Sequence, residues 1–494
     1  MKVQRQFVQV GARRVMVRHA GRGPAVVLVH QSPQSSRALM PWIERLAAQY
    51  AVFAPDTPGF GHSDPLPLAA PSITDYAEAL AELLGALGLQ RVLVFGMHTG
   101  AAIATQLALA HPQHVAGLVT DGLSLFDAEE CASLLAHYVP PFEPQWDGSH
   151  LRWLFARLRE QHLFFPWYDG RRAARLRYPL PAPERVHADV LDLLDAGDGY
   201  RAAYRAAFQY APRGALPSLQ VPALLAWRAG DVLAPHAPRC PALPAASRAA
   251  VLMGGEGELV KCTDNHFAAC AAGATVADAA ASMAAAPAAT RRIVAAGGVE
   301  WAFHLAPGGD APARLSLGDI GQPAAVPESG AGPRIAVELP GHGASLAAAE
   351  LDVAMPRLAA ALHEALAALL PATAPLELQA QGAGAVLARH LARALGARCT
   401  ALQTAGLPPA DAAARRHFLQ QLPALAPDAQ GGHLLAAWDW ARQSQLFDPW
   451  QPATAAGVLD APAPDPQRLH EHVREVLRAG PLHAALWRAA LDEE

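Results

Sequence analysis

The chain has 494 residues, of which 52% are hydrophobic and 17% charged, and its formal net charge is −5. This composition is that of a globular protein, and the length is enough for two or more domains. Charges of both signs are spread along the chain without a basic stripe, which argues against nucleic acid as a partner.

The compartment and the cofactor requirement are inferred from features that the sequence lacks. The N-terminus has no apolar core of a signal peptide, and no uncharged apolar run reaches the roughly 18–20 residues of a membrane span. We therefore expect a cytoplasmic protein that does not bind a membrane. The five cysteines are scattered and lack the spacing of zinc ligands, so we expect free thiols, no metal and no cofactor.

Strands and helices alternate along the first half of the chain. Periodicity and β-branched runs predict strands at residues 7–10, 14–19, 25–29, 51–54, 115–120, 222–227 and 249–253. Helical spacing is found over residues 41–48 and 73–87. The first two strands would form an antiparallel hairpin, and the later ones a mostly parallel sheet covered by helices on both faces. The predicted fold class is α/β.

The segment Val92–Ala102, VLVFGMHTGAA, predicts a short strand, a tight turn and an Ala-rich helix. A G-x-Nuc-x-G turn between a strand and a helix is a nucleophile elbow, which lifts one side chain above the carboxyl end of a parallel sheet. Gly96 and Gly100 flank the turn and allow the strand and the helix to approach closely. The lifted residue is His98, where a Ser, Cys or Asp is usual.

The strand pattern stops after residue 121 for about a hundred residues. We expect residues from about 126 to 215 to form a helical cap that closes an apolar pocket and excludes water. Aromatic side chains are frequent in this segment, and Phe164, Phe165 and Trp167 are expected to line the pocket.

Three motifs carry a resemblance to a known family: HQSP at 30–33, DTPGFGHSD at 56–64 and GMHTG at 96–100. Together with Asp231, which follows a later predicted strand, their order resembles that of a capped α/β-hydrolase of the epoxide hydrolase and haloalkane dehalogenase branch. HQSP with GxHTG also resembles a little-characterised subgroup that carries histidine at the elbow. The resemblance covers residues 1–275 and implies an α/β-hydrolase fold with a cap.

The resemblance also implies an oxyanion hole and a supporting acid. In this fold the backbone N–H groups of Gln31 and Thr99 would form the hole, and backbone donors are present whatever side chain occupies position 98. Asp231 is the expected orienting acid. Asp121, at the end of the preceding strand, is the alternative.

The histidine of the family is expected at His266, although His266 follows its strand at a longer distance than is usual. If His266 is absent from the site, Glu258 could take the role of base. His30 is expected to shape the oxyanion loop and to border the pocket.

The second half of the chain repeats motifs of the first at offsets of 282 to 284 residues. Residues 148–151 match 431–434, 58–61 match 340–343, and the elbow matches 380–384. The pair Pro166-Trp167 matches Pro449-Trp450, and His187 matches His470. The sequence therefore predicts a tandem duplication: two α/β-hydrolase units at 1–275 and 293–494, joined by an Ala-rich, partly helical linker at 276–292.

The second unit is expected to be degenerate. Its elbow position is Gly382, and Ala405 stands in place of Asp121. The strands that would carry an acid and a histidine do not follow the segment that repeats the cap. Loss of those strands would leave an edge strand that proteins normally cover. We expect a non-catalytic half that acts as an intramolecular pseudo-dimer partner, and a homodimer is also open.

Three functions are compatible with a histidine at the elbow. A neutral imidazole is nucleophilic and can form a labile acyl-imidazole, which would give a hydrolase acting on a small apolar ester, lactone or related acyl compound. As a general base, His98 would instead support cofactor-free lyase, decarboxylase or oxygenase chemistry. The third reading is a pseudoenzyme that binds a ligand without turning it over. Hydrolysis, with His98 supported by Asp231 and His266, is the leading hypothesis.

Overall fold

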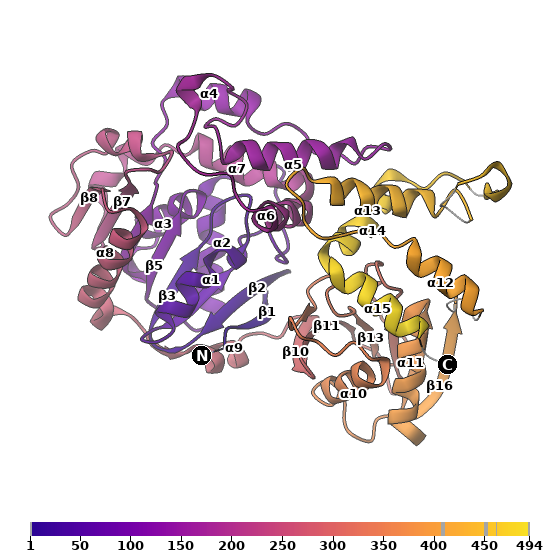
Figure 1. The fold of residues 1–494 in the computed structure, drawn as a ribbon. Helices are drawn as coiled ribbons and strands as arrows, with labels where there is room; N and C mark the ends of the chain where they lie inside the picture. Colours follow the sequence, from indigo (N-terminus) through magenta and orange to yellow (C-terminus); the bar gives the residue numbers. More distant parts are fainter. Residues whose placement is uncertain (1, 407–410, 449–452, 461, 493–494) are drawn as a thin grey trace. The chain divides into compact units, whose positions relative to one another are not determined.

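The structure is a computed structural model that describes residues 2–406, 411–448, 453–460 and 462–492 (Figure 1). The chain divides into two compact units, each of which is described by itself. The first comprises Met1–Glu143, Ala156–Pro181 and Ala188–Ala289, and the second comprises Pro144–Phe155, Ala182–His187 and Thr290–Glu494.

The first unit contains a nine-stranded sheet and most of the helices of the first half. Its strands are β1 Gln4–Val10, β2 Arg13–Ala20, β3 Arg22–Val29, β4 Ala51–Pro55, β5 Val92–Met97, β6 Val115–Asp121, β7 Ala223–Arg228, β8 Ser247–Leu252 and β9 Val276–Asp278. Its helices are α1 Met40–Leu46, α2 Ile73–Ala86, α3 Thr99–Ala110, α4 Ala128–His137, α7 Tyr200–Gln209, α8 Gly255–Cys270 and α9 Ala279–Ala285. Helices α5 Ser149–Gln161 and α6 Pro183–Ala196 have residues in both units.

The strand order of this sheet is β1-β2-β4-β3-β5-β6-β7-β8, with β9 paired to the end of β3. Strands β1 and β2 form an antiparallel hairpin, and β3 to β8 pair in parallel. The predicted α/β class, hairpin and mostly parallel sheet are therefore confirmed. Parallel strands end at a common edge of the sheet, and the residues that follow β3, β5, β6 and β7 are brought together there.

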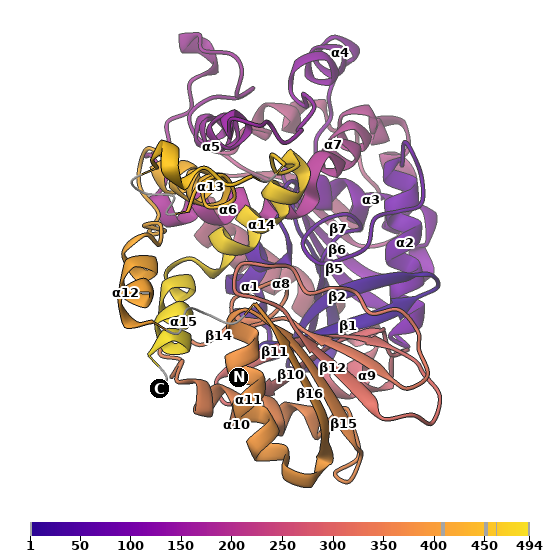
Figure 2. The same ribbon diagram turned by 90° about the vertical axis from the view of Figure 1, so that its right-hand side faces the viewer.

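Helices cover both faces of this sheet, which explains why β4 and β6 are buried along their whole length. One face packs on α1 and α8, where the Trp42 ring stacks on Phe95 at 4.4 Å and Phe267 is fully buried. Helices α2 and α3 lie on the other face (Figure 2).

The turn between β5 and α3 depends on two glycines. A Cβ on Gly100 would collide with the carbonyl oxygen of Val29, and a Cβ on Gly96 would collide with that of Gly100. The absence of side chains at these positions therefore lets α3 start directly above the end of β3, close to the centre of the sheet.

The helical insertion predicted between the strands at 115–120 and 222–227 is present as α4 to α7. Its aromatic side chains pack mainly within the insertion. The rings of Tyr138, Trp167, Tyr200 and Tyr204 surround the buried guanidinium of Arg157 at 5.4–5.9 Å from its carbon. Cation–π contacts of this kind compensate part of the cost of burying the charge.

The segment 276–292, predicted as a linker, is packed rather than free. Its strand β9 pairs with β3, and in α9 the side chains of Ala279 and Met283 are fully buried. The Gln6 side chain also donates a hydrogen bond to the Met283 carbonyl at 2.7 Å. The first unit accordingly extends to Ala289, and the second includes two short segments, 144–155 and 182–187, that were predicted in the first.

The second unit has its own sheet. Its strands are β10 Arg291–Ala296, β11 Val299–Ala306, β12 Ala313–Leu317, β13 Arg334–Val337, β14 Leu346–Ala347, β15 Leu376–Gln381 and β16 Cys399–Ala405. Its helices are α10 Met355–Leu366, α11 Ala383–Leu395, α12 Ala412–Gln420, α13 Gly432–Gln443, α14 Pro466–Ala479 and α15 Pro481–Leu491.

The order of the second sheet, β10-β11-β13-β12-β15-β16, reproduces the first six positions of the first sheet. Strand β16 is its last strand, and the pairing of Gln381 with Ala405 matches that of Met97 with Asp121. Within the described residues, no strand follows β16 in this sheet. Pro449 and Trp450, which repeat Pro166 and Trp167, lie outside the described residues.

Two histidine pairs in the second unit are arranged reciprocally. His150 Nε2 lies 3.2 Å from His470 Nδ1, and His187 Nδ1 lies 3.0 Å from His433 Nε2. In the sequence, His433 repeats His150 and His470 repeats His187. His150 therefore contacts the repeat of His187, and His187 contacts the repeat of His150.

Two glycines pack in the same reciprocal way as these histidines. A Cβ on Gly148 would press on the ring of Trp438, and a Cβ on Gly431 would press on the ring of Phe155. Gly431 repeats Gly148, and Trp438 stands where Phe155 stands in the first copy. The reciprocal pattern thus includes these two glycines as well as the histidines.

Candidate active site

His98 occupies the turn between β5 and α3 in a strained backbone conformation. Its φ is 47° and its ψ −109°, and it has the only positive φ of a non-glycine residue in the described chain. Such conformations cost of order 1–3 kcal/mol and persist where the surrounding structure enforces them. The backbone N–H of His98 donates to the Asp121 carbonyl at 2.9 Å, which fixes the turn against the end of β6.

The imidazole of His98 is held by Asp231, three residues after β7. His98 Nε2 lies 2.9 Å from Asp231 Oδ2. The His98 side chain is 26% exposed, whereas that of Asp231 is only 6% exposed. The lifted residue and the predicted orienting acid are therefore in direct contact.

Arg228, the last residue of β7, connects this pair to Asp121. Its Nε and Nη2 lie 3.0 and 2.9 Å from the two carboxylate oxygens of Asp121, and Nη2 lies 3.3 Å from Asp231 Oδ2. Asp121 is completely buried. The guanidinium thus neutralises two carboxylates that would otherwise repel each other at the edge of the sheet.

The charges of this cluster decide the protonation of His98. Burial acts to lower the pKa of His98, but the charge of Asp231, its hydrogen bond and the charge of Asp121 outweigh burial and raise that pKa above its ordinary value of 6.5. For Asp231, burial acts to raise the pKa. The charge and hydrogen bond of His98, the Leu233 N–H and Arg228 outweigh burial and lower that pKa to about 2. Burial is the largest influence on Asp121 and raises its pKa despite Arg228.

The contact with Asp231 selects a tautomer. A carboxylate accepts only, so the neutral imidazole donates from Nε2 and carries its lone pair on Nδ1. Nδ1 makes no hydrogen bond to any described residue. Nδ1 is therefore the atom of His98 that can attack a carbon or accept a proton.

Backbone donors for an oxyanion lie at the start of α3 and in the loop after β3. Thr99 is the first residue of α3, and the N–H groups of Thr99, Gln31 and Ser32 donate to no described residue. The second unit indicates which loop residue is used, because there a carboxylate accepts from the third residue after β12, Ile320. The third residue after β3 is Ser32, so the geometry favours Ser32 over the predicted Gln31.

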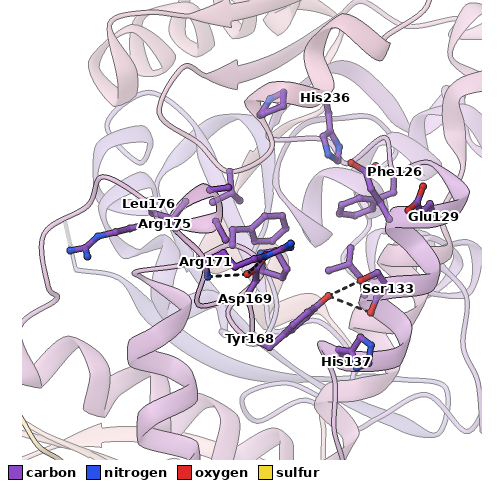
Figure 3. A pocket seen from close by; sticks show the side chains of 18 of the residues that line it. Phe126, Glu129, Ser133, His137, Tyr168, Asp169, Arg171, Arg175, Leu176 and His236 are labelled. Carbon is purple, nitrogen blue, oxygen red and sulfur yellow. Dashed lines mark hydrogen bonds and ion pairs between the residues drawn. The ribbon is translucent and has the colours of Figure 1, made fainter.

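An open cavity of about 900 Å³ in the first unit is bordered by Asp231, the partner of His98. Figure 3 shows its wall, with Phe126 and His236 facing Tyr168 and the ion pair of Asp169 with Arg171. Asp231 lines the cavity as well as holding His98. A ligand in the cavity would therefore lie beside the carboxylate that orients the imidazole.

Of the aromatic residues predicted to line the pocket, Phe165 borders this cavity. The other two belong to the packing of the cap. Phe164 pairs with Arg175 in a short antiparallel bridge, and the indole of Trp167 donates to the Tyr138 carbonyl at 3.0 Å and covers Arg157. The Phe and Tyr side chains that line this cavity are Phe126, Phe165 and Tyr168.

His30 is buried and joins two loops rather than lining the cavity. Its Nε2 accepts from the Thr57 N–H at 2.8 Å, and its Nδ1 lies 3.0 Å from the Gln31 carbonyl. Burial lowers its pKa, so the ring is neutral. His30 therefore holds the loop after β3 against the loop after β4.

His266 does not take part in the site, contrary to the prediction. It lies in α8, and its Nε2 is 3.3 Å from the carbonyl of Pro222, which precedes β7. His98 and Asp231 lie at the other end of β7. Glu258 caps the start of α8 by accepting from the Gly254 N–H at 2.7 Å and is not a partner of His98 either. The fold places the imidazole of the site on the elbow residue itself.

Arg228 is a functional residue that sequence reasoning missed. Its signal was present in the sequence: an arginine ends the strand after the one that ends in Asp121. Because neighbouring parallel strands end at the same edge, a buried carboxylate there requires a cation beside it. Two carboxylates at this edge, Asp121 and Asp231, need a cation between them, and this need points to Arg228.

The described part of the chain contains no group of three or more His, Cys, Asp or Glu side chains that could hold a metal ion. A separate search of the described helices finds none long and apolar enough to cross a lipid bilayer.

Comparison with known proteins supports the fold of the first unit. The profile of the alpha/beta hydrolase fold family matches residues 24–248. An uncharacterized protein of Mycobacterium tuberculosis is 37% identical over 114 residues, which is 23% of this chain and 33% of the relative. A pimeloyl-[acyl-carrier protein] methyl ester esterase of Shewanella is 34% identical over 20% of this chain and 35% of the esterase.

A fluoroacetate dehalogenase of Burkholderia is 32% identical over 23% of this chain and 39% of the dehalogenase. The matches to these three relatives therefore span less than half of each relative's length. The profile match and the strand order of the first sheet are both those of the alpha/beta hydrolase fold, and they show this fold for residues 24–248.

Proposed function

We propose that the first unit hydrolyses a small apolar ester, lactone or related acyl compound, with Nδ1 of His98 as the reacting atom. The observation that carries the proposal is the 2.9 Å contact between His98 Nε2 and Asp231 Oδ2, which leaves Nδ1 with the lone pair. Relatives named as an esterase and a dehalogenase support a hydrolytic reaction. The substrate class rests on the apolar side chains in the cavity lining, among them Phe126, Leu134 and Phe165, which lie beside charged residues of the same lining.

In the nucleophilic route, Nδ1 attacks the acyl carbonyl carbon and its C=O electrons move onto oxygen. The N–H groups of Thr99 and Ser32 would stabilise this oxyanion, each by about 3–4 kcal/mol. Collapse expels the alkoxide, which takes a proton from water, and leaves an acyl-imidazolium whose Nε2–H still donates to Asp231. Water then cleaves the acyl–nitrogen bond and restores His98.

In the base route, Nδ1 takes a proton from a water molecule as that water attacks the carbonyl. The imidazolium that forms is stabilised by Asp231, as in a serine hydrolase triad. The raised pKa of His98 makes it a stronger base, and for this reason proton abstraction from a bound carbon acid is the second candidate function.

The experiment is a panel of p-nitrophenyl esters and lactones of short to medium acyl chains, followed by rapid acid quench and intact-mass measurement. His98→Gln is the matched control, because Gln keeps a polar side chain without a nucleophilic nitrogen. Turnover with an acyl adduct on His98 supports the nucleophilic route, and turnover without an adduct supports the base route. Absence of turnover across the panel would contradict hydrolysis.

The second unit is proposed as a non-hydrolytic repeat that arose by tandem duplication. Its shared strand order and its reciprocal histidine pairs support this origin. An intramolecular pseudo-dimer would account for the reciprocal histidine pairs. Expression of residues 1–290 alone tests it: a stable and fully active fragment would contradict a required partner role.

A further inference from the structure

The second unit has a cavity of about 600 Å³ at the carboxyl ends of its central strands. Asp319, the second residue after β12, lines it, and Gly382 follows β15 directly. The site of the first unit lies at the same edge of its own sheet, after β3 and β5. The second unit therefore has a cavity where the fold holds its ligands, although its elbow residue has no side chain.

The carboxylate of Asp319 occupies the place of an oxyanion. Its Oδ1 accepts from the backbone N–H groups of Ile320 and Ala383, each at 2.8 Å. Ala383 begins α11 as Thr99 begins α3. A unit whose anion donors are already filled by its own side chain has none left for a substrate oxyanion.

The glycine at the elbow is a requirement of this arrangement. Gly382 has a φ of +54°, and a Cβ there would collide with all three atoms of the Asp319 carboxyl group. The second unit thus carries a carboxylate on the loop after β12 in the space that the elbow side chain would need. Asp319 Oδ2 has no hydrogen-bond partner among the described residues, so one oxygen remains for a ligand.

One part of the rest of the cavity is aromatic, and another is polar, with Gln322, Gln421 and Gln445 in the lining. Trp440, Trp487, Phe418 and Phe447 line the aromatic part, and both indoles are more than nine-tenths buried. The fifth ring is His472, which stacks on Trp440 at 5.5 Å. Burial lowers the pKa of His472 to about 4, so it adds no positive charge at neutral pH.

Two further charged residues, Asp448 and Arg468, border the cavity and are exposed to solvent. Water screens these charges, whereas Asp319 is more shielded. An acidic group among aromatic faces is the chemistry that recognises organic cations, because the ring faces and the carboxylate both attract positive charge.

We propose that the second unit binds an organic cation, an alkylammonium or quaternary ammonium group, in this cavity. The carboxylate of Asp319 is the counter-ion, and the rings of Trp440 and Trp487 provide the aromatic faces. This function is separate from catalysis in the first unit.

Calorimetric titration of the full chain with choline at pH 7.5 tests the proposal. Burial raises the pKa of Asp319 to about 6, against the effect of the Ala383 and Ile320 N–H groups, so the group is charged at this pH. The neutral isostere 3,3-dimethyl-1-butanol has the shape of choline without its charge. We expect choline to bind at least tenfold more tightly than the isostere.

Asp319→Asn is the matched variant, because its amide oxygen can still accept from Ile320 and Ala383 while the charge is lost. This variant is expected to lose the preference for choline, whereas Asp448→Asn at the exposed rim is expected to change the affinity less than twofold. Unchanged selectivity in Asp319→Asn would overturn the assignment.

Two results with the unmodified protein would also overturn the proposal, even if the variant failed to fold. The first is equal affinity for choline and its isostere, or no binding of either. The second is tighter binding of acetate than of choline, which would make the cavity an anion site.

Discussion

The Nε2 atom of His98 lies 2.9 Å from Oδ2 of Asp231, so the elbow residue contacts the acid of the site directly. In a serine hydrolase, a separate histidine stands between the elbow serine and the acid. Here one residue supplies both the elbow side chain and the imidazole. This explains why the site is complete without His266, which lies at the opposite end of β7.

The pH dependence of activity should reflect the raised pKa of His98. The reactive form is the neutral imidazole, so kcat/KM should rise with pH and reach half its plateau above pH 6.5. Asp231→Asn removes the charge that raises this pKa, and the half-maximum should move to lower pH while the plateau falls by about a hundredfold or more. An unshifted profile in Asp231→Asn would show that another group titrates.

The same shift has a consequence for stability. A pKa raised on folding means that the folded state favours the charged imidazole, and this contribution is fully present below the ordinary pKa of 6.5. It is lost as the pH rises through the folded-state pKa. This contribution is measured by urea unfolding of wild type and His98→Gln between pH 5 and 9. The free energy of unfolding of the wild type should exceed that of the variant by an amount that decreases with increasing pH.

The backbone strain at His98 predicts that glycine is favoured there over alanine. Both His98→Gly and His98→Ala lose the contact with Asp231, so their difference reports on the strain at a φ of 47°, set against the greater freedom of glycine in the unfolded chain. We expect His98→Gly to be more stable by about 1–2 kcal/mol in urea unfolding. The second unit has Gly382 at the equivalent turn with a φ of 54°. Equal stabilities of the two variants would mean that the turn relaxes without cost.

Removal of Arg228 should leave Asp121 as an uncompensated buried charge. Arg228→Met is expected to destabilise the first unit by about 3–5 kcal/mol at neutral pH. The loss should be smaller at low pH, where Asp121 becomes protonated, and smaller in the double variant with Asp121→Asn. If Arg228→Met destabilised the wild type and the Asp121→Asn variant equally, Arg228 would act through packing instead.

The position of the His98 ring depends on the absence of a side chain at Gly122. A Cβ there would lie 2.6 Å from His98 Cδ2, and Gly122 has a φ of +75°. Gly122→Ala should therefore lower kcat/KM by about tenfold or more, because a small displacement of a catalytic group is costly.

Gly11→Ala is the control for the backbone effect of that substitution. Gly11 also has a positive φ, +56°, but nothing lies within 4 Å of the added Cβ. The positive φ should cost each variant about 1 kcal/mol of stability, the clash with the ring should add to the loss in Gly122→Ala, and only Gly122→Ala should lose activity. Equal activity of the two alanine variants would contradict the close packing of the ring.

Much of the first unit could be predicted from local patterns. The β-branched run at 25–29 and the helical spacing at 73–87 correspond to β3 and α2, since burial on both faces and amphipathic packing leave direct traces in a sequence. The contact of His98 with Asp231 was also accessible, because both follow strands that end at the same edge of the sheet.

Other features depend on tertiary packing and could not be obtained in this way. The Ala-rich segment at 276–292 has the composition of a linker, but Met283 is buried in the first unit. His266 was assigned from chain order, which does not determine the end of the strand at which a side chain lies. The role of Asp319 depends on the loop after β12 lying beside the elbow, whereas the sequence shows only that Gly382 lacks a side chain.

The most direct test of the central claim is chemical rescue of His98→Ala. The kcat/KM for a p-nitrophenyl ester that the wild type hydrolyses is measured with and without added imidazole. If Nδ1 of His98 performs the chemistry, the variant should be about 10²–10⁴-fold slower than the wild type, and imidazole entering the cavity should restore part of the rate. A variant that retains the wild-type rate without imidazole would contradict a catalytic role for His98.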